Sequence, residues 1–140
     1  MVYVNVIIIC VIGIKTNMQT QRIALIQNKS YEDYLQKEIY GTDVTTLINK
    51  AISDNENNKV PKDEKENYIN NEQNSIQIDI VMITNQEKGK TQTYKMETIN
   101  KVGITEFIKN FNTAKFKCSQ IKYHNQTGKI AYIEIAQLED

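Results

Sequence analysis

The sequence predicts an α+β fold: an N-terminal apolar segment and a long helix, a second amphipathic helix, and then a mainly antiparallel sheet of four to five strands with one short inserted helix. Two patterns support this prediction. Apolar residues recur at helical spacing early in the chain, and they alternate at strand spacing later. Because tight turns separate the later segments, we expect antiparallel neighbours with the helices on one face of the sheet.

The first fourteen residues, 1–14, are almost wholly apolar, and the run ends at Lys15. A membrane-spanning helix needs about 20 apolar residues, and shorter runs are more often core segments or parts of signal peptides. No Lys or Arg precedes the run, whereas a secretory signal begins with basic residues. Three interpretations stay open: a membrane anchor or uncleaved signal-anchor, a cleaved signal, or a buried core strand over residues 2–12, because Val and Ile favour strands.

We favour the anchor, because the run lies at the terminus of the chain and the next stretch reads as a helix. The organisation would then be an anchor over residues 1–14, followed by a single α+β domain over residues 15–140 that begins with a helical stem. The positive-inside rule points the other way on topology, since Lys15, Arg22 and Lys29 follow the run.

Two helices are expected after the apolar run. The first covers Lys15 to Tyr40, and Gly41 ends it, as glycine often does beyond a helix terminus. Thr42 would cap the second helix, with Asp43 in its first turn, where the helix dipole favours an anion. This second helix would end near Asp54–Asn55, and it has the clearest amphipathic stripe in the chain: Val44, Leu47, Ile48, Ala51 and Ile52.

The remaining elements are mostly strands joined by polar turns. A polar loop with the only proline is followed by a possible short strand, a turn, a hairpin, a short helix and a final hairpin. Their expected ranges are 55–66 for the loop, 65–69 for the short strand, 70–74 for the turn, 75–84 and 91–98 for the first hairpin, 103–112 for the helix, and 114–124 and 129–138 for the last hairpin. Gly128 is the natural left-handed residue of the last turn.

The charge balance argues against a nucleic-acid binder. The chain has 17 basic and 17 acidic residues, so its formal net charge is zero, and nucleic-acid binders usually show a basic excess. Arg22 is the one arginine, and arginine is the preferred residue for bidentate recognition of phosphate or carboxylate. No small-molecule substrate is evident, and no Gly-rich phosphate loop is present.

No residue pattern predicts catalysis, a cofactor or a metal. His124 is the one histidine, and we interpret it as a solvent-facing residue at a strand end. Cys10 lies in the apolar run and Cys118 in a strand, so we expect no disulfide between them, and a buried thiol at Cys118. One histidine with two distant cysteines cannot form a tetrahedral zinc site. In an extended strand His124 would lie about 20 Å from Cys118, which excludes a direct pair.

Acidic and aromatic clusters are expected to be structural. The acidic pairs Glu32/Asp33, Asp63/Glu64 and Glu139/Asp140 are interpreted as solvated surface charge, and the oxygen-rich segment 54–58 lacks the glycine and closing glutamate of a calcium loop. Three tyrosines fall within ten residues of the first helix: Tyr31, Tyr34 and Tyr40. We expect them to pack on the chain's own sheet rather than to form a partner surface.

The layout of an apolar terminus, an amphipathic helix and an antiparallel sheet resembles the type IV pilin-like and pseudopilin-type small membrane-anchored proteins. The segment Gly41-Thr42-Asp43-Val44-Thr45-Thr46-Leu47-Ile48-Asn49-Lys50 is also similar to the opening of a helix in small single-pass extracytoplasmic proteins of Firmicutes. The resemblance implies a role in a surface or secretion assembly, and no functional residue carries over from it.

The function predicted from the sequence is therefore non-enzymatic. We expect a single-pass cell-membrane protein of a bacterium, anchored by residues 1–14, whose extracytoplasmic domain works through contacts with other protein subunits, as an accessory or minor pilin-like subunit. The alternative is a cytosolic α+β binding module in which residues 2–12 form a buried core strand.

Overall fold

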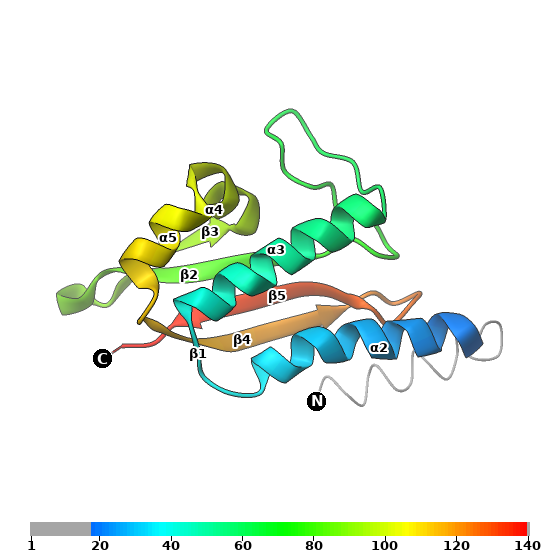
Figure 1. Cartoon of the computed structure of the whole chain (residues 1–140), viewed down its shortest axis with the longest axis horizontal. Coiled ribbons are helices and arrows are strands. Elements are labelled where there is room, and N and C mark those ends of the chain that lie inside the picture. Colours follow the sequence, from blue (N-terminus) through cyan, green and yellow to red (C-terminus); the bar gives the residue numbers. More distant parts are fainter. Residues whose placement is uncertain (1–17, 140) are drawn as a thin grey trace.

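The computed structural model of the protein describes residues 18–139 (Figure 1). The predicted anchor over residues 1–14 and the start of the predicted stem lie outside this range. In the described part, four α-helices combine with a five-stranded sheet, which confirms the α+β class. The elements are α2 (Met18–Leu35), β1 (Ile39–Tyr40), α3 (Gly41–Asn57), β2 (Gln77–Asn85), a 3-10 turn (Gln86–Lys88), β3 (Lys90–Lys95), α4 (Met96–Val102), α5 (Ile104–Phe111), β4 (Lys115–Tyr123) and β5 (Ile130–Gln137).

The sheet is mixed, so the prediction of a mainly antiparallel sheet needs correction. Its strand order is β1-β4-β5-β2-β3. The β1–β4, β4–β5 and β2–β3 pairs are antiparallel, but the central β2–β5 pair is parallel. The two hairpins were predicted correctly, but hairpins alone do not determine how they join. The Ile130–Gln137 segment has no exposed residue, as expected of a strand with neighbours on both sides.

The boundary between the first two helices differs from the prediction. Helix α2 ends at Leu35, Ile39 and Tyr40 form β1, and Gly41 begins α3 instead of ending the preceding helix. A Cβ atom at Gly41 would lie 2.0 Å from the carbonyl oxygen of Phe111, so glycine is needed there for close approach of two backbones. The Asp43 carboxylate accepts a hydrogen bond from the Tyr40 amide at 3.0 Å, a capping contact two residues before the predicted cap at Thr42.

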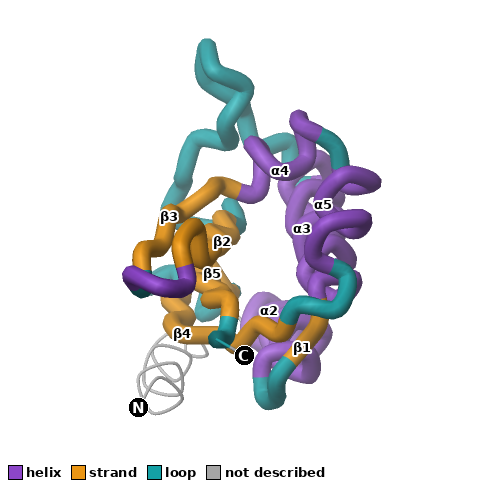
Figure 2. The backbone as a smooth tube through the Cα atoms, turned by 90° about the vertical axis from the view of Figure 1, so that its left-hand side faces the viewer, coloured by secondary structure: helices purple, strands orange, loops and turns teal. Residues whose placement is uncertain are grey.

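Helix α3 confirms the predicted amphipathic stripe and ends at Asn57, a few residues beyond the expected end. Val44, Leu47, Ile48 and Ala51 are completely buried. They face the sheet, because α3 crosses its middle over β2 and β5 (Figures 1 and 2). On β2, the residues that meet this stripe are the buried alternating set Ile78, Ile80 and Met82.

Two predicted strands are shorter than expected or missing. The predicted strand over 91–98 ends at Lys95, and α4 begins at Met96, which is fully buried. The possible strand over 65–69 is reduced to an isolated bridge between Lys62 and Tyr68. In both places tertiary contacts outweigh local strand preference. The predicted turn over 70–74 is present, since the Asn71 side chain accepts hydrogen bonds from three following amides.

The described residues share one hydrophobic core between the helices and one face of the sheet (Figure 2). Its largest fully buried side chains include Tyr31, Phe116, Ile78, Ile133 and Ile135. The opposite sheet face carries polar side chains such as Gln77, Asp79 and Glu134. Within residues 18–139, no helix has the length and apolar character required to cross a bilayer.

Candidate binding surfaces

His124 is buried, which corrects the expectation of a solvent-facing histidine. Its side chain is 6% exposed, and its Nε2 lies 2.7 Å from the carbonyl oxygen of Ser75. Because a carbonyl only accepts, Nε2 carries the proton of this hydrogen bond. Burial lowers the pKa of His124, and the charge of Lys129 adds to this, while the Ser75 carbonyl opposes it. The residue therefore ties the β4–β5 turn to the start of β2.

Cys118 is a free thiol in β4 that is only half-buried, so the expectation of a buried thiol beside Phe116 is met in part. Burial raises the pKa of the thiol, and the nearby charge of Glu134 acts in the same direction. A raised pKa keeps the sulfur protonated and poorly nucleophilic. Cys10 lies outside the described residues.

The tyrosines of the first predicted helix have different environments. Tyr31 is buried, and its hydroxyl donates to the Asp54 carboxylate at 2.5 Å, which links α2 to α3. Burial, followed by the Asp54 hydrogen bond, raises the pKa of Tyr31 strongly. Tyr34 is half-buried against the core, whereas Tyr40 is exposed. Packing on the chain's own fold therefore accounts for Tyr31 and Tyr34.

Within residues 18–139, the members of the predicted acidic pairs do not converge on a site, and Asp140 lies outside this range. Glu32 accepts a hydrogen bond from the Tyr123 hydroxyl at 2.9 Å, so it is more than a solvated charge. Asp63 closes a turn by accepting from the amides of Lys65 and Asn67, and these bonds lower its pKa. Across residues 18–139, no group of three or more His, Cys, Asp or Glu side chains is arranged to hold a metal ion.

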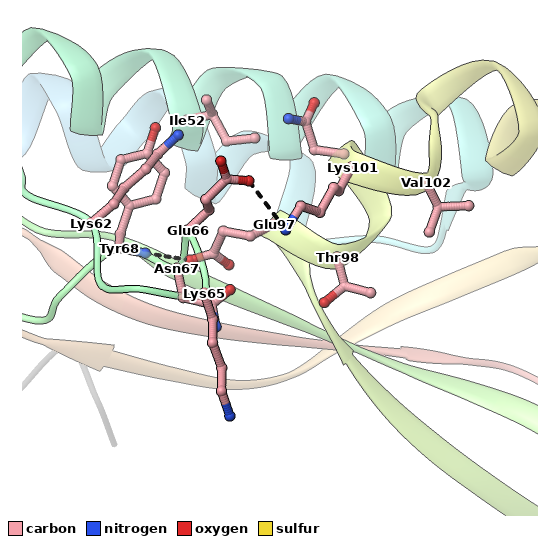
Figure 3. A pocket seen from close by; sticks show the side chains of 11 residues that line it. Ile52, Lys62, Lys65, Glu66, Asn67, Tyr68, Glu97, Thr98, Lys101 and Val102 are labelled. Atoms are coloured by element: carbon pink, nitrogen blue, oxygen red, sulfur yellow. Dashed lines mark hydrogen bonds and ion pairs between the residues drawn. The ribbon is translucent and has the colours of Figure 1, made fainter.

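A polar pocket of about 310 Å³ lies between the loop after α3 and helix α4 (Figure 3). Glu97, which is 7% exposed, stands at its base. One Glu97 oxygen accepts from the Tyr68 amide at 2.9 Å, and the other accepts from Gln77 Nε2 at 3.1 Å. Sequence reasoning missed Glu97, because a glutamate in a polar stretch gives no signal of burial.

The lysines around this pocket are largely engaged in pairs. Lys101 lies 3.1 Å from a Glu66 carboxylate oxygen, and the Lys62 ammonium lies 4.9 Å from the centre of the Tyr68 ring. The Lys65 side chain extends away from Glu97 (Figure 3). The contacts of Glu97 and Lys101 therefore hold the loop against α4. The lysines do not form a cluster of positive charge that would bind an anion.

An apolar groove of about 420 Å³ lies on the other side of α4. Its walls come from the end of β2, from Tyr94 of β3, and from α4 and α5. The apolar side chains that line it are Met82, Ile83, Tyr94, Ile99, Val102, Phe107 and Phe111. Glu106 is the one charged residue in this lining. Val102 is 73% exposed, so part of the groove wall is open to solvent. Among the described surfaces, this groove has the apolar lining that is typical of a binding site.

Comparisons of the chain with protein-family models, with curated proteins and with solved structures give no match.

Proposed function

We propose that this protein is a non-enzymatic interaction domain held at the cell membrane by residues 1–14, with its domain on the extracytoplasmic side. It would act through protein–protein contacts, as an accessory or minor subunit of a surface or secretion assembly. The observation that carries the proposal is that a hydrophobic core of buried side chains lies within residues 18–139, all of them beyond the apolar run.

The core supports a separable anchor. The buried cluster runs from Tyr31 to Ile135 and includes side chains from all four described helices or their flanking segments and from the sheet. Within the described part, every buried side-chain nitrogen and oxygen has a hydrogen-bond partner. A hydrophobic core and satisfied buried polar groups within residues 18–139 favour an anchor over an additional core strand at residues 2–12. These residues are then available as a membrane anchor.

The placement of the reactive side chains supports a binding role over catalysis. His124 is bonded to a backbone carbonyl, Glu97 has both oxygens engaged, and Cys118 has a raised thiol pKa. A catalytic acid or base instead needs an atom that is free to exchange a proton with a substrate within hydrogen-bond reach. The apolar groove beside α4, by contrast, offers contact area rather than reactive groups.

The test uses the full chain with a C-terminal tag, expressed in a bacterium and treated with protease on intact cells. We expect the tag in the membrane fraction and sensitive to protease. A protected tag in the membrane fraction would contradict the extracytoplasmic topology, because the lysines after the run would then keep the domain inside. A protected tag in the soluble fraction would contradict the anchor.

Deleting residues 1–14 separates the anchor from the core-strand alternative. If the run is an anchor, the deleted protein keeps the cooperative unfolding transition of the full chain, measured by circular dichroism in urea. Loss of that transition would show that the run belongs to the core, and the cytosolic binding module would replace our proposal.

A further inference from the structure

Among residues 18–139, the β3 edge of the sheet has no strand neighbour. Five of the six residues of β3 are exposed. An unpaired edge offers a row of backbone N–H and C=O groups for strand pairing. Proteins use such edges to bind extended segments of other chains.

The hydrogen-bond pattern of β2 shows which β3 groups face outward. The Ile83 amide donates to Gln137 Oε1 on the β5 side at 2.9 Å. The backbone N–H and C=O groups of successive strand residues point to alternate neighbours. The backbone groups of Ile80 and Met82 therefore point toward β3, where these residues pair with Tyr94 and Gln92. It follows that the backbone groups of Thr91 and Thr93 point away from the sheet, toward a partner.

The apolar groove lies on the face of the sheet that the helices cover. A strand added beside β3 would direct half of its side chains toward this face. Tyr94 faces the groove, and its strand partner Ile80 is fully buried on the core side. Side chains of an added strand alternate between the two faces, so every second one would point toward α4 and α5. The exposed Val102 and the partly buried Phe111 are the surfaces it would contact.

The charge of β3 decides between a second copy and a different partner. The strand reads Lys-Thr-Gln-Thr-Tyr-Lys, with a lysine at each end and no acidic residue, and Lys88 precedes it. Pairing of two copies along this edge would bring two strands that each carry lysines and no acidic residue side by side, which is unfavourable. An extended segment with acidic residues would instead be attracted.

We propose that the β3 edge and the adjoining groove bind an extended acidic segment of a partner protein by strand addition, with a large apolar side chain of that segment seated in the groove. This proposal rests on the interaction function proposed above, and it names the surface and the chemistry of the partner. Backbone pairing at Thr91 and Thr93 supplies the attachment, and the groove and the lysines supply selectivity.

The test is a selection of random peptides displayed on phage against the full chain in detergent micelles. We expect enriched peptides that contain acidic residues and a large apolar residue and that lack proline. The enriched peptide with the strongest signal is then synthesised with a fluorescent label, and its affinity is measured by fluorescence anisotropy. The oligomeric state of the unliganded chain is measured in the same micelles by light scattering.

Three substitutions locate the bound peptide. Thr93→Pro removes an outward amide and should weaken binding at least about tenfold, whereas the matched control Thr93→Ala keeps the amide and should bind normally. Val102→Glu places a charge at the groove, and Lys90→Glu reverses the charge at one end of β3. Each should weaken binding of the acidic peptide several-fold, and the Lys90→Glu effect should shrink at high salt. Circular dichroism confirms that each variant is folded.

The outcomes separate this proposal from the broader function. Enriched peptides whose binding is unchanged by Thr93→Pro and Val102→Glu would overturn the β3 site but leave the interaction function standing. No enrichment, enrichment of basic peptides, or a dimer that Thr93→Pro dissociates would also overturn the proposal of an acidic partner segment. The protease and deletion experiments above test the membrane-held domain independently of all these results.

Discussion

At one edge of the sheet, β4 is flanked by the two-residue strand β1 and by helix α2. At the other edge, β3 has no strand neighbour in the described part of the chain (Figure 1). The first edge is held by specific contacts. Asn28 of α2 joins the β4–β5 turn, and Glu32 of α2 meets Tyr123 of β4. Covering an edge in this way prevents unwanted pairing. The difference indicates that specific side-chain contacts cover one edge of the sheet, whereas the residues of β3 are left exposed to solvent.

The largest effect should come from Gly41, which lets β1 and α3 approach the end of α5. Gly41→Ala places a methyl group 2.0 Å from the Phe111 carbonyl oxygen, so we expect a loss of about 3 kcal/mol or more in the free energy of unfolding, measured in urea. Gly89→Ala is the matched control, because Gly89 has φ +61° but open space around it. It should cost only about 1 kcal/mol, from backbone strain. Equal losses would show that close approach at Gly41 is unimportant.

Asn28 should give the next largest effect, because it is buried and satisfies two backbone groups. Its Nδ2 donates to the Gly128 carbonyl, and its Oδ1 accepts from the Ile130 amide, both at 2.8 Å. Asn28→Ala leaves both groups unpaired, so we expect a loss of about 2 to 3 kcal/mol in the free energy of unfolding. The neighbouring exposed residue gives the control, Lys29→Ala, with a change within about 0.5 kcal/mol. A small loss for Asn28→Ala would mean that α2 is not needed at this edge.

His124 should make stability depend on pH at the closed edge. Its pKa is lowered in the folded protein, so between that value and the ordinary value near 6.5 the unfolded chain binds the extra proton. The free energy of unfolding should therefore fall as the pH is lowered from about 7 toward 5. Urea titrations should show a shallower fall for His124→Gln over the same range. Parallel curves for the two proteins would contradict this role of His124.

The smallest effect on stability is expected at the open edge. Thr93→Pro removes an amide that points away from β2, so the free energy of unfolding should change by less than about 1 kcal/mol. Gln92→Pro is the sharp comparison, because its amide faces Met82, and it should be clearly more destabilising. If Thr93→Pro were the worse of the two, the assignment of outward-facing groups on β3 would be wrong.

Local patterns in the sequence predicted most elements but not their arrangement. The stripe on α3, the two hairpins, the helix near 104–111 and the left-handed Gly128 all follow from short-range spacing. Ile39 fits a helical stripe equally well, and its place in β1 depends on Phe116, a partner 77 residues away. The roles of Gly41 and Met96 depend in the same way on distant contacts.

The candidate surfaces were less accessible to sequence reasoning. The interpretation of His124 as exposed was wrong because its burial depends on Ser75, far along the chain. The apolar groove forms where β2, β3, α4 and α5 come together, so the pattern of any one segment does not predict it. The burial of Glu97 likewise depends on tertiary contacts. The predicted membrane anchor, topology and pilin-like role stay predictions.

The parallel pair at the centre of the sheet also has a consequence for the order of folding. Residues 77–81 of β2 each pair with a β5 residue 55 positions later, as in Gln77 with Tyr132. The β2–β3 hairpin and the β4–β5 hairpin are local units, but they become one sheet only when this long loop closes. Because contacts between residues far apart in the sequence slow folding, we expect the pairing of β5 with β2 to form late and to complete the domain. Before β5 emerges from the ribosome, a nascent chain could form the β2–β3 hairpin but neither the β4–β5 hairpin nor the central parallel pair.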